Sequence, residues 1–281
     1  MLKPKKLSEN TGAGQLASMM MGYTQGKSVH ELPLSQLQDA PAEWNFFKPL
    51  PSDKFFELVE SIEKNGLLNP LLVWEKTEKE YMLLSGHNRK RALELIFDKT
   101  SDSRYGNAPC ILYQGNALDE DVARNILVDC NWVQRTLSPA EKAQAVYYKY
   151  VTMGRRSKGE GRGYEAVAAH FGLKATQVYQ YYQMAQLDPE WLARLDAGVI
   201  SIKAAAHLAK LSAAQRELLK EYMSDGAIGN SEILSILKKD TPEDMKVKLQ
   251  KKERMRELRM LVPENRYDEA VELLEKWMSE G

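Results

Sequence analysis

One short stretch, residues 164–182 (YEAVAAHFGLKATQVYQYY), restricts the fold of this chain more than any other. A helix-turn-helix requires a small residue where its two helices cross, a glycine four residues later for a left-handed turn, and a β-branched residue six positions further on. Ala168, Gly172 and Val178 meet these three requirements. The stretch therefore predicts a first helix over Tyr164–Phe171 and a second from residue 175 or 176 to Met184. Any tight pair of helices shares this spacing, and that alternative stays open here.

The second predicted helix carries outward-facing groups that suit nucleic acid. Amide, hydroxyl and cationic side chains can address base edges and phosphates; here they are Lys174, Thr176, Gln177, Tyr179 and Gln180. Gln177 and Gln180 are the candidates for reading bases. The glycine-rich stretch before the motif, GRRSKGEGRG over residues 154–163, adds Arg155, Arg156, Lys158 and Arg162. These cations would contact phosphates and make binding depend on salt, or would simply face water.

The distribution of charge agrees with a single basic module. The whole chain has no net charge, with 39 Lys or Arg and 39 Asp or Glu. Residues 131–183 hold eight Lys or Arg against three Asp or Glu, a net charge of +5, whereas residues 31–130 hold eleven against seventeen, a net charge of −6. Either one module meets a polyanion, or the surface charge is scattered without a function.

The periodicity of apolar residues changes along the chain and indicates an α+β domain followed by helices. Residues 1–29 lack large aliphatic runs and are predicted to be a flexible tail. Residues 30–130 alternate between short apolar runs and helix patterns. Strands are predicted at 31–37, 71–74, 81–84 and 110–113. One helix is predicted to be capped by Ser52 and to stop at Asn65-Gly66, and another is predicted at 88–97. Residues 131–225 and 226–281 are predicted to be helical, apart from the glycine-rich stretch 154–163, which cannot form a regular element.

Capping residues give the starts of the later helices. Ser138, Pro139 and Glu141 form the pattern of a capping box with proline at the first helical position, and this helix should run to about Met153. Further starts are predicted at Asp188-Pro189, Ser201, Ser212 and Thr241-Pro242. Apolar residues of the last segment could pair subunits or only cover the helical domain; they are Met245, Leu249, Ala270, Leu273, Leu274 and Trp277, interrupted at Pro263.

Composition excludes several classes of protein. No apolar run approaches the ~18 residues that a membrane span needs, and no secretory signal is recognisable, so the expected location is the cytoplasm and no membrane partner is expected. The two cysteines, Cys110 and Cys130, cannot form a disulfide framework and lack the spacing of metal ligands. Both are predicted to be packing residues.

A second candidate site lies at LLSGHNRKRAL, residues 83–93, where a glycine separates a predicted strand from a predicted helix. Backbone N–H groups and the positive end of the helix dipole converge at such a junction, which suits a phosphate. Asn88, Arg89 and Arg91 add further donors, because the planar guanidinium matches phosphate oxygens. The alternative is a tight turn followed by a helix with a cationic, solvent-facing side.

Four segments together resemble the ParB family of DNA-segregation proteins. They are LVESIEKNGLLNPLLVW (58–74), YMLLSGHNRKRALEL (81–95), CNWVQRTLSPAEKA (130–143) and the helix-turn-helix, in the same order and with similar spacing, and the resemblance covers about residues 31 to 215. It implies a ParB/sulfiredoxin-like α+β domain, an all-α helix-turn-helix domain and a helical C-terminal region. It also implies a pocket for CTP and magnesium, and a dimeric clamp that closes over DNA when CTP binds.

The match to the family's three pocket motifs is partial. The family patterns are G-x-x-Q-P-I, G-E-R-R-x-R-A and E-N-x-x-R-x-x-L-N-P-x-E-x-A. Carried over by position, the nucleotide- or phosphate-binding residues are Asn69, Gly86, His87, Asn88, Arg89 and Arg91, with Asn131 as a magnesium candidate. His87 and Cys130 stand where the family has glutamates that support metal and water. We therefore expect weak or altered CTP binding and slow or absent hydrolysis, and assign no catalytic residue.

The resemblance also predicts function and partners. It implies sequence-specific binding to a palindromic site in double-stranded DNA by a homodimer, with a ParA-like Walker ATPase as a further partner. The role would be partition of a plasmid, chromosome or mobile element, in the nucleoid- or plasmid-associated part of the cytoplasm. Two alternatives remain: a transcriptional regulator on the same scaffold, or an enzyme such as a nuclease or kinase. Sulfiredoxin chemistry is not expected, because the residue after Gly86 is His87 and no cysteine lies in that loop.

Overall fold

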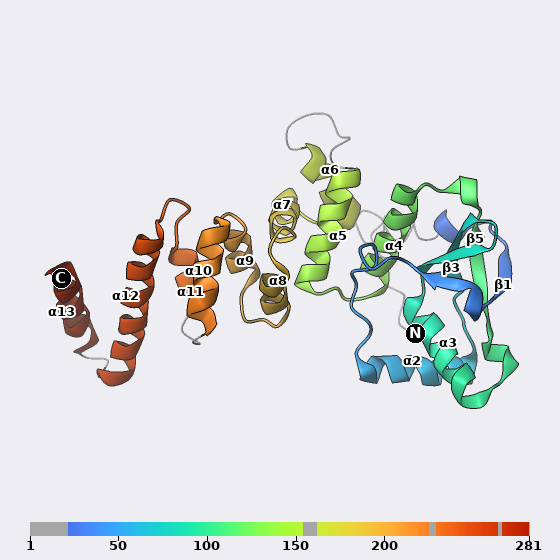
Figure 1. Cartoon of the computed structure of the whole chain (residues 1–281), viewed down its shortest axis with the longest axis horizontal. Helices are drawn as coiled ribbons and strands as arrows, with labels where there is room; N and C mark the ends of the chain where they lie inside the picture. Colours follow the sequence, from blue (N-terminus) through green and yellow to red (C-terminus); the bar gives the residue numbers. More distant parts are fainter. Residues whose placement is uncertain (1–21, 154–161, 225–228, 264–265, 281) are drawn as a thin grey trace, which may run out of the picture. The chain divides into compact units, whose positions relative to one another are not determined.

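The computed structural model describes residues 22–153, 162–224, 229–263 and 266–280 (Figure 1). The chain divides into two compact units, Met1–Tyr182 and Gln183–Gly281, and each is described by itself. This division differs from the predicted boundaries after residues 130 and 225, which stay a prediction. Helix α4 (Glu120–Gln134) runs continuously across the first of them.

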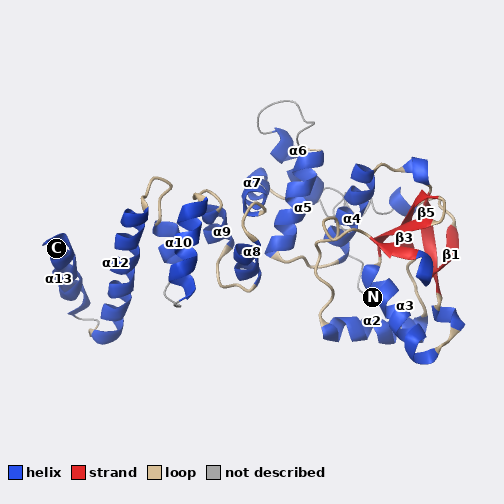
Figure 2. Ribbon diagram, viewed as in Figure 1, coloured by secondary structure: helices blue, strands red, loops and turns tan. Residues whose placement is uncertain are grey.

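The first unit contains a mixed five-stranded sheet (Figure 2). Its strands are β1 (Val29–Pro33), β2 (Leu37–Asp39), β3 (Leu71–Thr77), β4 (Glu80–Ser85) and β5 (Asn107–Tyr113), in the order β1-β5-β3-β4-β2. β3 and β4 form an antiparallel hairpin, whereas β3 pairs with β5 in parallel. A parallel pair needs a crossover connection, and β4 with helix α3 (His87–Thr100) supplies it.

Helices α2 (Ser52–Asn65) and α3 pack on this sheet and form its core. Leu71, Val73 and Leu83 of the sheet are fully buried in one cluster with Ile62 of α2 and Ile96 of α3. Cys110 belongs to the same cluster, as the predicted packing role requires. The α+β class predicted for this part of the chain is confirmed.

Two local predictions in this domain are wrong. Ser52 does not cap α2: Pro51 is the N-cap residue, with extended backbone and no capping side chain, so Ser52 becomes the first helical residue. The strand predicted over residues 31–37 ends at Pro33 and is followed by a single 3-10 turn, Leu34–Gln36. Proline has no N–H to continue a ladder, and the chain crosses to the opposite edge of the sheet, where β2 pairs with β4.

The rest of the first unit is helical. It holds α4, α5 (Pro139–Thr152), α6 (Arg162–Phe171) and α7 (Ala175–Met184), the last of which runs two residues past Tyr182. The predicted capping box at α5 is confirmed, since Ser138 and Glu141 each bond the other's backbone N–H. Helix α4 begins at the capping residue Asp119 and was not predicted as an element.

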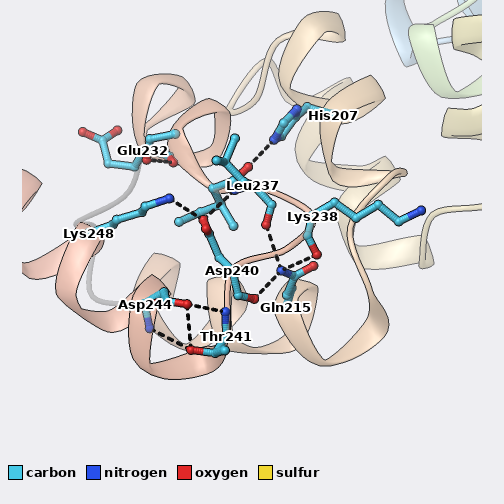
Figure 3. A network of polar contacts seen from close by, with 11 residues as sticks. His207, Gln215, Glu232, Leu237, Lys238, Asp240, Thr241, Asp244 and Lys248 are labelled. Atoms are coloured by element: carbon cyan, nitrogen blue, oxygen red, sulfur yellow. Dashed lines mark hydrogen bonds and ion pairs between the residues drawn. The ribbon is translucent and has the colours of Figure 1, made fainter.

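The second unit consists of helices. They are α8 (Pro189–Asp196), α9 (Ile202–Leu208), α10 (Ala213–Ser224), α11 (Asn230–Ser235), α12 (Pro242–Leu261) and α13 (Tyr267–Glu280). Side chains of Ser201, Ser212 and Thr241 cap their helices as predicted, whereas Asp188 makes no capping hydrogen bond. Figure 3 shows how buried Gln215 donates to the carbonyls of Leu237 and Asp240 and so fixes the turn before α12.

Along the described ranges, no helix combines the length and the apolar character needed to cross a bilayer.

Candidate functional site

The turn between β4 and α3 has a backbone conformation that strongly favours glycine. Gly86 has φ +106°, a left-handed conformation that other residues rarely adopt. A Cβ added to it would overlap the Leu71 side chain and lie 3.2 Å from the Arg89 guanidinium. The positive end of α3 is therefore held against the sheet with no side chain in front of its first N–H groups.

A cavity of about 400 Å³ opens in front of this turn. Its lining includes Gly86, His87, Asn88, Arg89, Arg91 and Asn131, six of the seven residues predicted for the nucleotide and its metal. Two more cations, Lys48 and Arg135, join from the loop before α2 and the end of α4, and Asp39 supplies the one carboxylate among the lining residues that the structure describes. This balance of charge favours an anionic ligand.

Arg89 lies between this cavity and a second one of about 500 Å³. Its Nη1 donates to the carbonyls of Asn69, at 2.6 Å, and Pro70, at 2.9 Å. Asn69 lines only the second cavity, where Arg89 is the one other predicted phosphate ligand among the described lining residues. Burial lowers the pKa of Arg89 because it penalises the charged guanidinium. A bound phosphate would give this guanidinium a partner of opposite charge.

Glu141 lies behind the first cavity and holds two of its lining residues, Arg135 and Lys48. It is 4% exposed, and Oε1 accepts from Arg135, at 3.0 Å, and from the backbone N of Lys48, at 2.7 Å. Its Oε2 accepts from the backbone N of Ser138 at 2.7 Å. The carboxylate that caps α5 thus also fixes the loop before α2 and one arginine of the cavity wall.

Neither residue that replaces a motif glutamate can act as a carboxylate here. Burial lowers the pKa of His87 to about 4, so its ring is neutral at pH 7, and its buried Nε2 has no hydrogen-bond partner among the described residues. Burial raises the pKa of Cys130 to about 12 and outweighs a hydrogen bond with Ser85. The Cys130 thiol therefore stays protonated, which confirms its predicted packing role.

The described residues give a metal ion little support. Nδ2 of Asn131 donates to the Leu127 carbonyl at 3.0 Å within its own helix. Across the described ranges no three Asp, Glu, His or Cys residues are grouped so that they could hold a metal. Because Mg²⁺ prefers six oxygen ligands, an ion at Asn131 would depend on phosphate oxygens and water for most of them.

The predicted helix pair is confirmed and presents the predicted side chains. Gly172 has φ +68°, Leu173 N donates to the Ala168 carbonyl at 2.9 Å, and Val167 and Val178 are fully buried. Of the five predicted outward residues on and before α7, all are exposed: Lys174, Thr176, Gln177, Tyr179 and Gln180.

Gln177 has a second task that the sequence does not reveal. Its Oε1 accepts from the backbone N of Lys174 at 3.0 Å and so caps the start of α7. Gln180 is therefore the better candidate for reading a base. Of the predicted phosphate contacts in the preceding stretch, Arg155, Arg156 and Lys158 lie outside the described residues, and Arg162 is the first residue of α6.

A buried ionic cluster, not predicted from the sequence, joins α4 to α5 and α6. Asp129 is fully buried; its Oδ2 accepts from Lys149 Nζ at 2.9 Å and from the Tyr23 hydroxyl at 3.1 Å. Its Oδ1 lies 2.8 Å from His170 Nε2, and Lys149 also donates to Asn125 Oδ1 at 2.7 Å. Burial alone would raise the pKa of Asp129, but the bond to His170 and the charge of Lys149 lower it overall.

The N-terminal part of the chain matches a known protein family. Residues 19–103 match the sequence pattern described as the ParB N-terminal domain, a range that contains the Gly86 turn and all of α3. This part of the chain is thus similar to the N-terminal domain of ParB proteins. The match therefore covers the α3 side of the cavity, whereas Asn131, Arg135 and the helix-turn-helix lie beyond it.

Individual ParB-family proteins are similar over more of the chain. The chromosome-partitioning protein Spo0J of Thermus thermophilus is 29% identical over 217 residues, which are 77% of this chain and 72% of that protein. Among solved structures, the C-terminally truncated ParB of Caulobacter crescentus complexed to the centromeric parS site is 20% identical, with a TM-score of 0.43 over 73% of this chain and 96% of that one. The same truncated protein complexed with CTP-gamma-S is 21% identical, with a TM-score of 0.31 over 70% and 99%.

Proposed function

We propose that this chain is a ParB-type DNA-partition protein that reads a palindromic site as a homodimer. The observation that carries the proposal is the exposed face of α7 with Lys174 just before it, where amide, hydroxyl and cationic side chains belong to a helix-turn-helix with the required packing. Partition is favoured over promoter regulation because the similar Spo0J protein of Thermus thermophilus is a chromosome-partitioning protein. A Walker-type ATPase would be the motor partner.

In the same proposal, the cavity in front of Gly86 binds the triphosphate of CTP. Support comes from four lining cations against one carboxylate, and from a helix N-terminus kept open by a residue without a side chain. Binding should be weak, because Asn88 stands in place of an arginine. Hydrolysis should be slow or absent, because neutral His87 and a protonated Cys130 thiol cannot orient a metal or water as glutamates do.

The experiment that tests DNA partition is recovery of DNA bound to the protein in its native host. A few clustered palindromes with bound DNA spreading on either side are expected. Binding at scattered promoters without spreading would contradict partition and favour the regulator.

Variants of α7 then test the readout on the recovered site. Gln180→Ala should lower specific affinity by about 1–3 kcal/mol and relax sequence preference at one position. Lys174→Ala should weaken all duplexes alike and make the dependence of log K on log salt shallower by about one. Lys99→Ala serves as the control, because it removes an exposed lysine of α3, outside the helix-turn-helix.

The nucleotide proposal is tested by titration with labelled CTP, with and without the cognate duplex. Saturable binding that Arg91→Ala weakens, and that Lys99→Ala at the far end of α3 does not, is expected. Product formation should stay at the level of the protein-free control. Turnover that disappears in Arg89→Ala would contradict slow hydrolysis, and an absence of binding to any nucleoside triphosphate would contradict the pocket assignment.

A further inference from the structure

Five tyrosines of α5, α6 and α7 form a continuous chain of ring contacts. They are Tyr147 and Tyr150 of α5, Tyr164 of α6, and Tyr179 and Tyr182 of α7. The Tyr164 ring stacks on Tyr150 with centroids 4.5 Å apart and an angle of 17° between the rings, and it meets Tyr182 edge-on at 6.0 Å. Tyr150 and Tyr182 are themselves 4.7 Å apart. The contacts therefore connect all three helices through Tyr164.

Tyr164 is held in one orientation by several contacts at once. Besides the ring stack, its hydroxyl is hydrogen-bonded to that of Tyr150. Burial, with this hydrogen bond, raises the pKa of Tyr164 to about 12, so the hydroxyl keeps its proton at pH 7. A side chain fixed by packing and by a hydrogen bond has few rotamers left and can orient a neighbour.

Tyr179 is the member of the chain that faces solvent. It is 41% exposed, whereas the other four tyrosines are partly buried. Its ring meets that of Tyr164 at 81°, with the centroids 5.6 Å apart, which is the edge-to-face geometry that aromatic pairs prefer. A tyrosine packed in this way keeps its apolar ring against the protein and its hydroxyl in water.

The place of Tyr179 on α7 brings this hydroxyl to the predicted DNA-reading side. Residues three and four apart share a face of a helix, so Tyr179 and Gln180 lie on the same face as Thr176, and all three are exposed. A hydroxyl beside a base-reading side chain suits a phosphate oxygen, because phosphate contacts fix the register of a protein on the duplex.

We propose that Tyr164 is a positioning residue, which orients the Tyr179 ring so that the Tyr179 hydroxyl donates to a phosphate of the bound duplex. This contact keeps Gln180 in register with its base. The role of Tyr164 rests on the proposed function and deepens it, because Tyr164 supports DNA binding without contacting DNA itself.

The test measures the affinity of the full chain for the palindromic site recovered from the host, by fluorescence anisotropy. Tyr179→Phe removes only the hydroxyl and should weaken binding by at least about 10-fold, because a hydrogen bond to a charged phosphate is lost. The same factor should apply to every single-base variant of the site, since a phosphate contact carries no sequence information. The slope of log K against log salt should stay unchanged, because the hydroxyl is neutral.

Tyr164→Leu tests the positioning role in two backgrounds. In the otherwise unmodified chain it should weaken binding by about 5-fold, because the Tyr179 side chain must then be ordered when DNA binds. In a Tyr179→Phe background it should have no further effect. Tyr164→Phe keeps the ring contacts and should retain the affinity of the unmodified chain. Tyr147→Leu is the matched control, since it removes a ring of the same chain that stacks on Tyr182 at 5.3 Å, and its affinity should be unchanged.

Three results would overturn this role. Equal losses from Tyr164→Leu in the two backgrounds would show that Tyr164 only supports the fold, and would leave the proposed function intact. A Tyr179→Phe effect confined to one base pair would show a base contact in place of the phosphate contact. If the unmodified chain showed no preference for the palindrome over a random duplex, the proposed function would fail, and the role of Tyr164 would fail with it.

Discussion

Replacing Lys149 with methionine should destabilise the first unit by several kcal/mol. Lys149 Nζ lies 2.9 Å from the fully buried Asp129 carboxylate, and the lysine side chain is itself 4% exposed. Removing one partner of a buried pair typically costs about 3–5 kcal/mol, because the other charge is left uncompensated. Asn125 Oδ1 loses its donor in the same change, so the effect of Lys149→Met should lie in the upper part of that range.

The double variant Asp129→Asn/Lys149→Met is the informative comparison. The amide introduced at position 129 can still accept a hydrogen bond from Tyr23 and face His170, and the thioether introduced at position 149 fills the volume of the lysine stem without a charge. Replacement of both charges in a buried pair is often nearly neutral, so the double variant should be more stable than either single variant.

The assay is urea denaturation followed by tryptophan fluorescence, with hydrogen exchange of α4 and α5 peptides to assign the transition to the first unit. The coupling energy from the double-mutant cycle should be at least about 2 kcal/mol. Additive effects of the two single variants would show that Asp129 and Lys149 do not interact energetically, and would refute the reasoning.

Two other predictions concern the turn and the cavity. Gly86→Ala should lower the free energy of unfolding by at least about 2 kcal/mol, because alanine is strained in the left-handed backbone and its Cβ would overlap Leu71. Gly66→Ala is the control: Gly66 has φ +71°, but the space around an added Cβ is open, so this variant should lose less stability in the same urea titration. Equal losses in the two variants would contradict the packing argument. Burial lowers the pKa of His87 from 6.5 to about 4. As the pH falls, His87 therefore takes up a proton in the unfolded chain before it does so in the folded chain. The stability that the neutral, buried His87 contributes is complete above pH 6.5 and is lost progressively down to about pH 4. The loss should approach about 3 kcal/mol, and His87→Asn should remove that part of the pH dependence of unfolding; an unchanged pH dependence would show that the ring is not buried in the neutral form.

Local signals made much of the fold predictable. The α5 capping box, the left-handed glycines at 66 and 172 and the apolar run of β3 each depend on residues close together in the sequence. Their structural consequences were therefore visible without tertiary contacts. The prediction that Ser52 caps α2 is wrong because the preceding residue, Pro51, already has the extended backbone of an N-cap residue.

The missed features depend on residues far apart in the sequence. Helix α4 was not predicted, because Asp129 and Cys130 interrupt its apolar pattern. The side chains that allow Asp129 to be buried belong to other helices. Asp129 is 20 residues from Lys149 and 41 from His170. The capping role of Gln177 was hidden for a different reason: a glutamine three residues after Lys174 suits a cap and a base contact equally well.

One turn of α4 faces two parts of the first unit at once. Asp129 points to Lys149 of α5 and His170 of α6, while Asn131, two residues further along the helix, lines the cavity in front of Gly86. A rigid helix cannot shift one of these residues without moving the other. Selection or engineering that changes ligand affinity at residue 131 would therefore also change how firmly the first helix of the DNA-reading motif is anchored, and the two properties should vary together among variants.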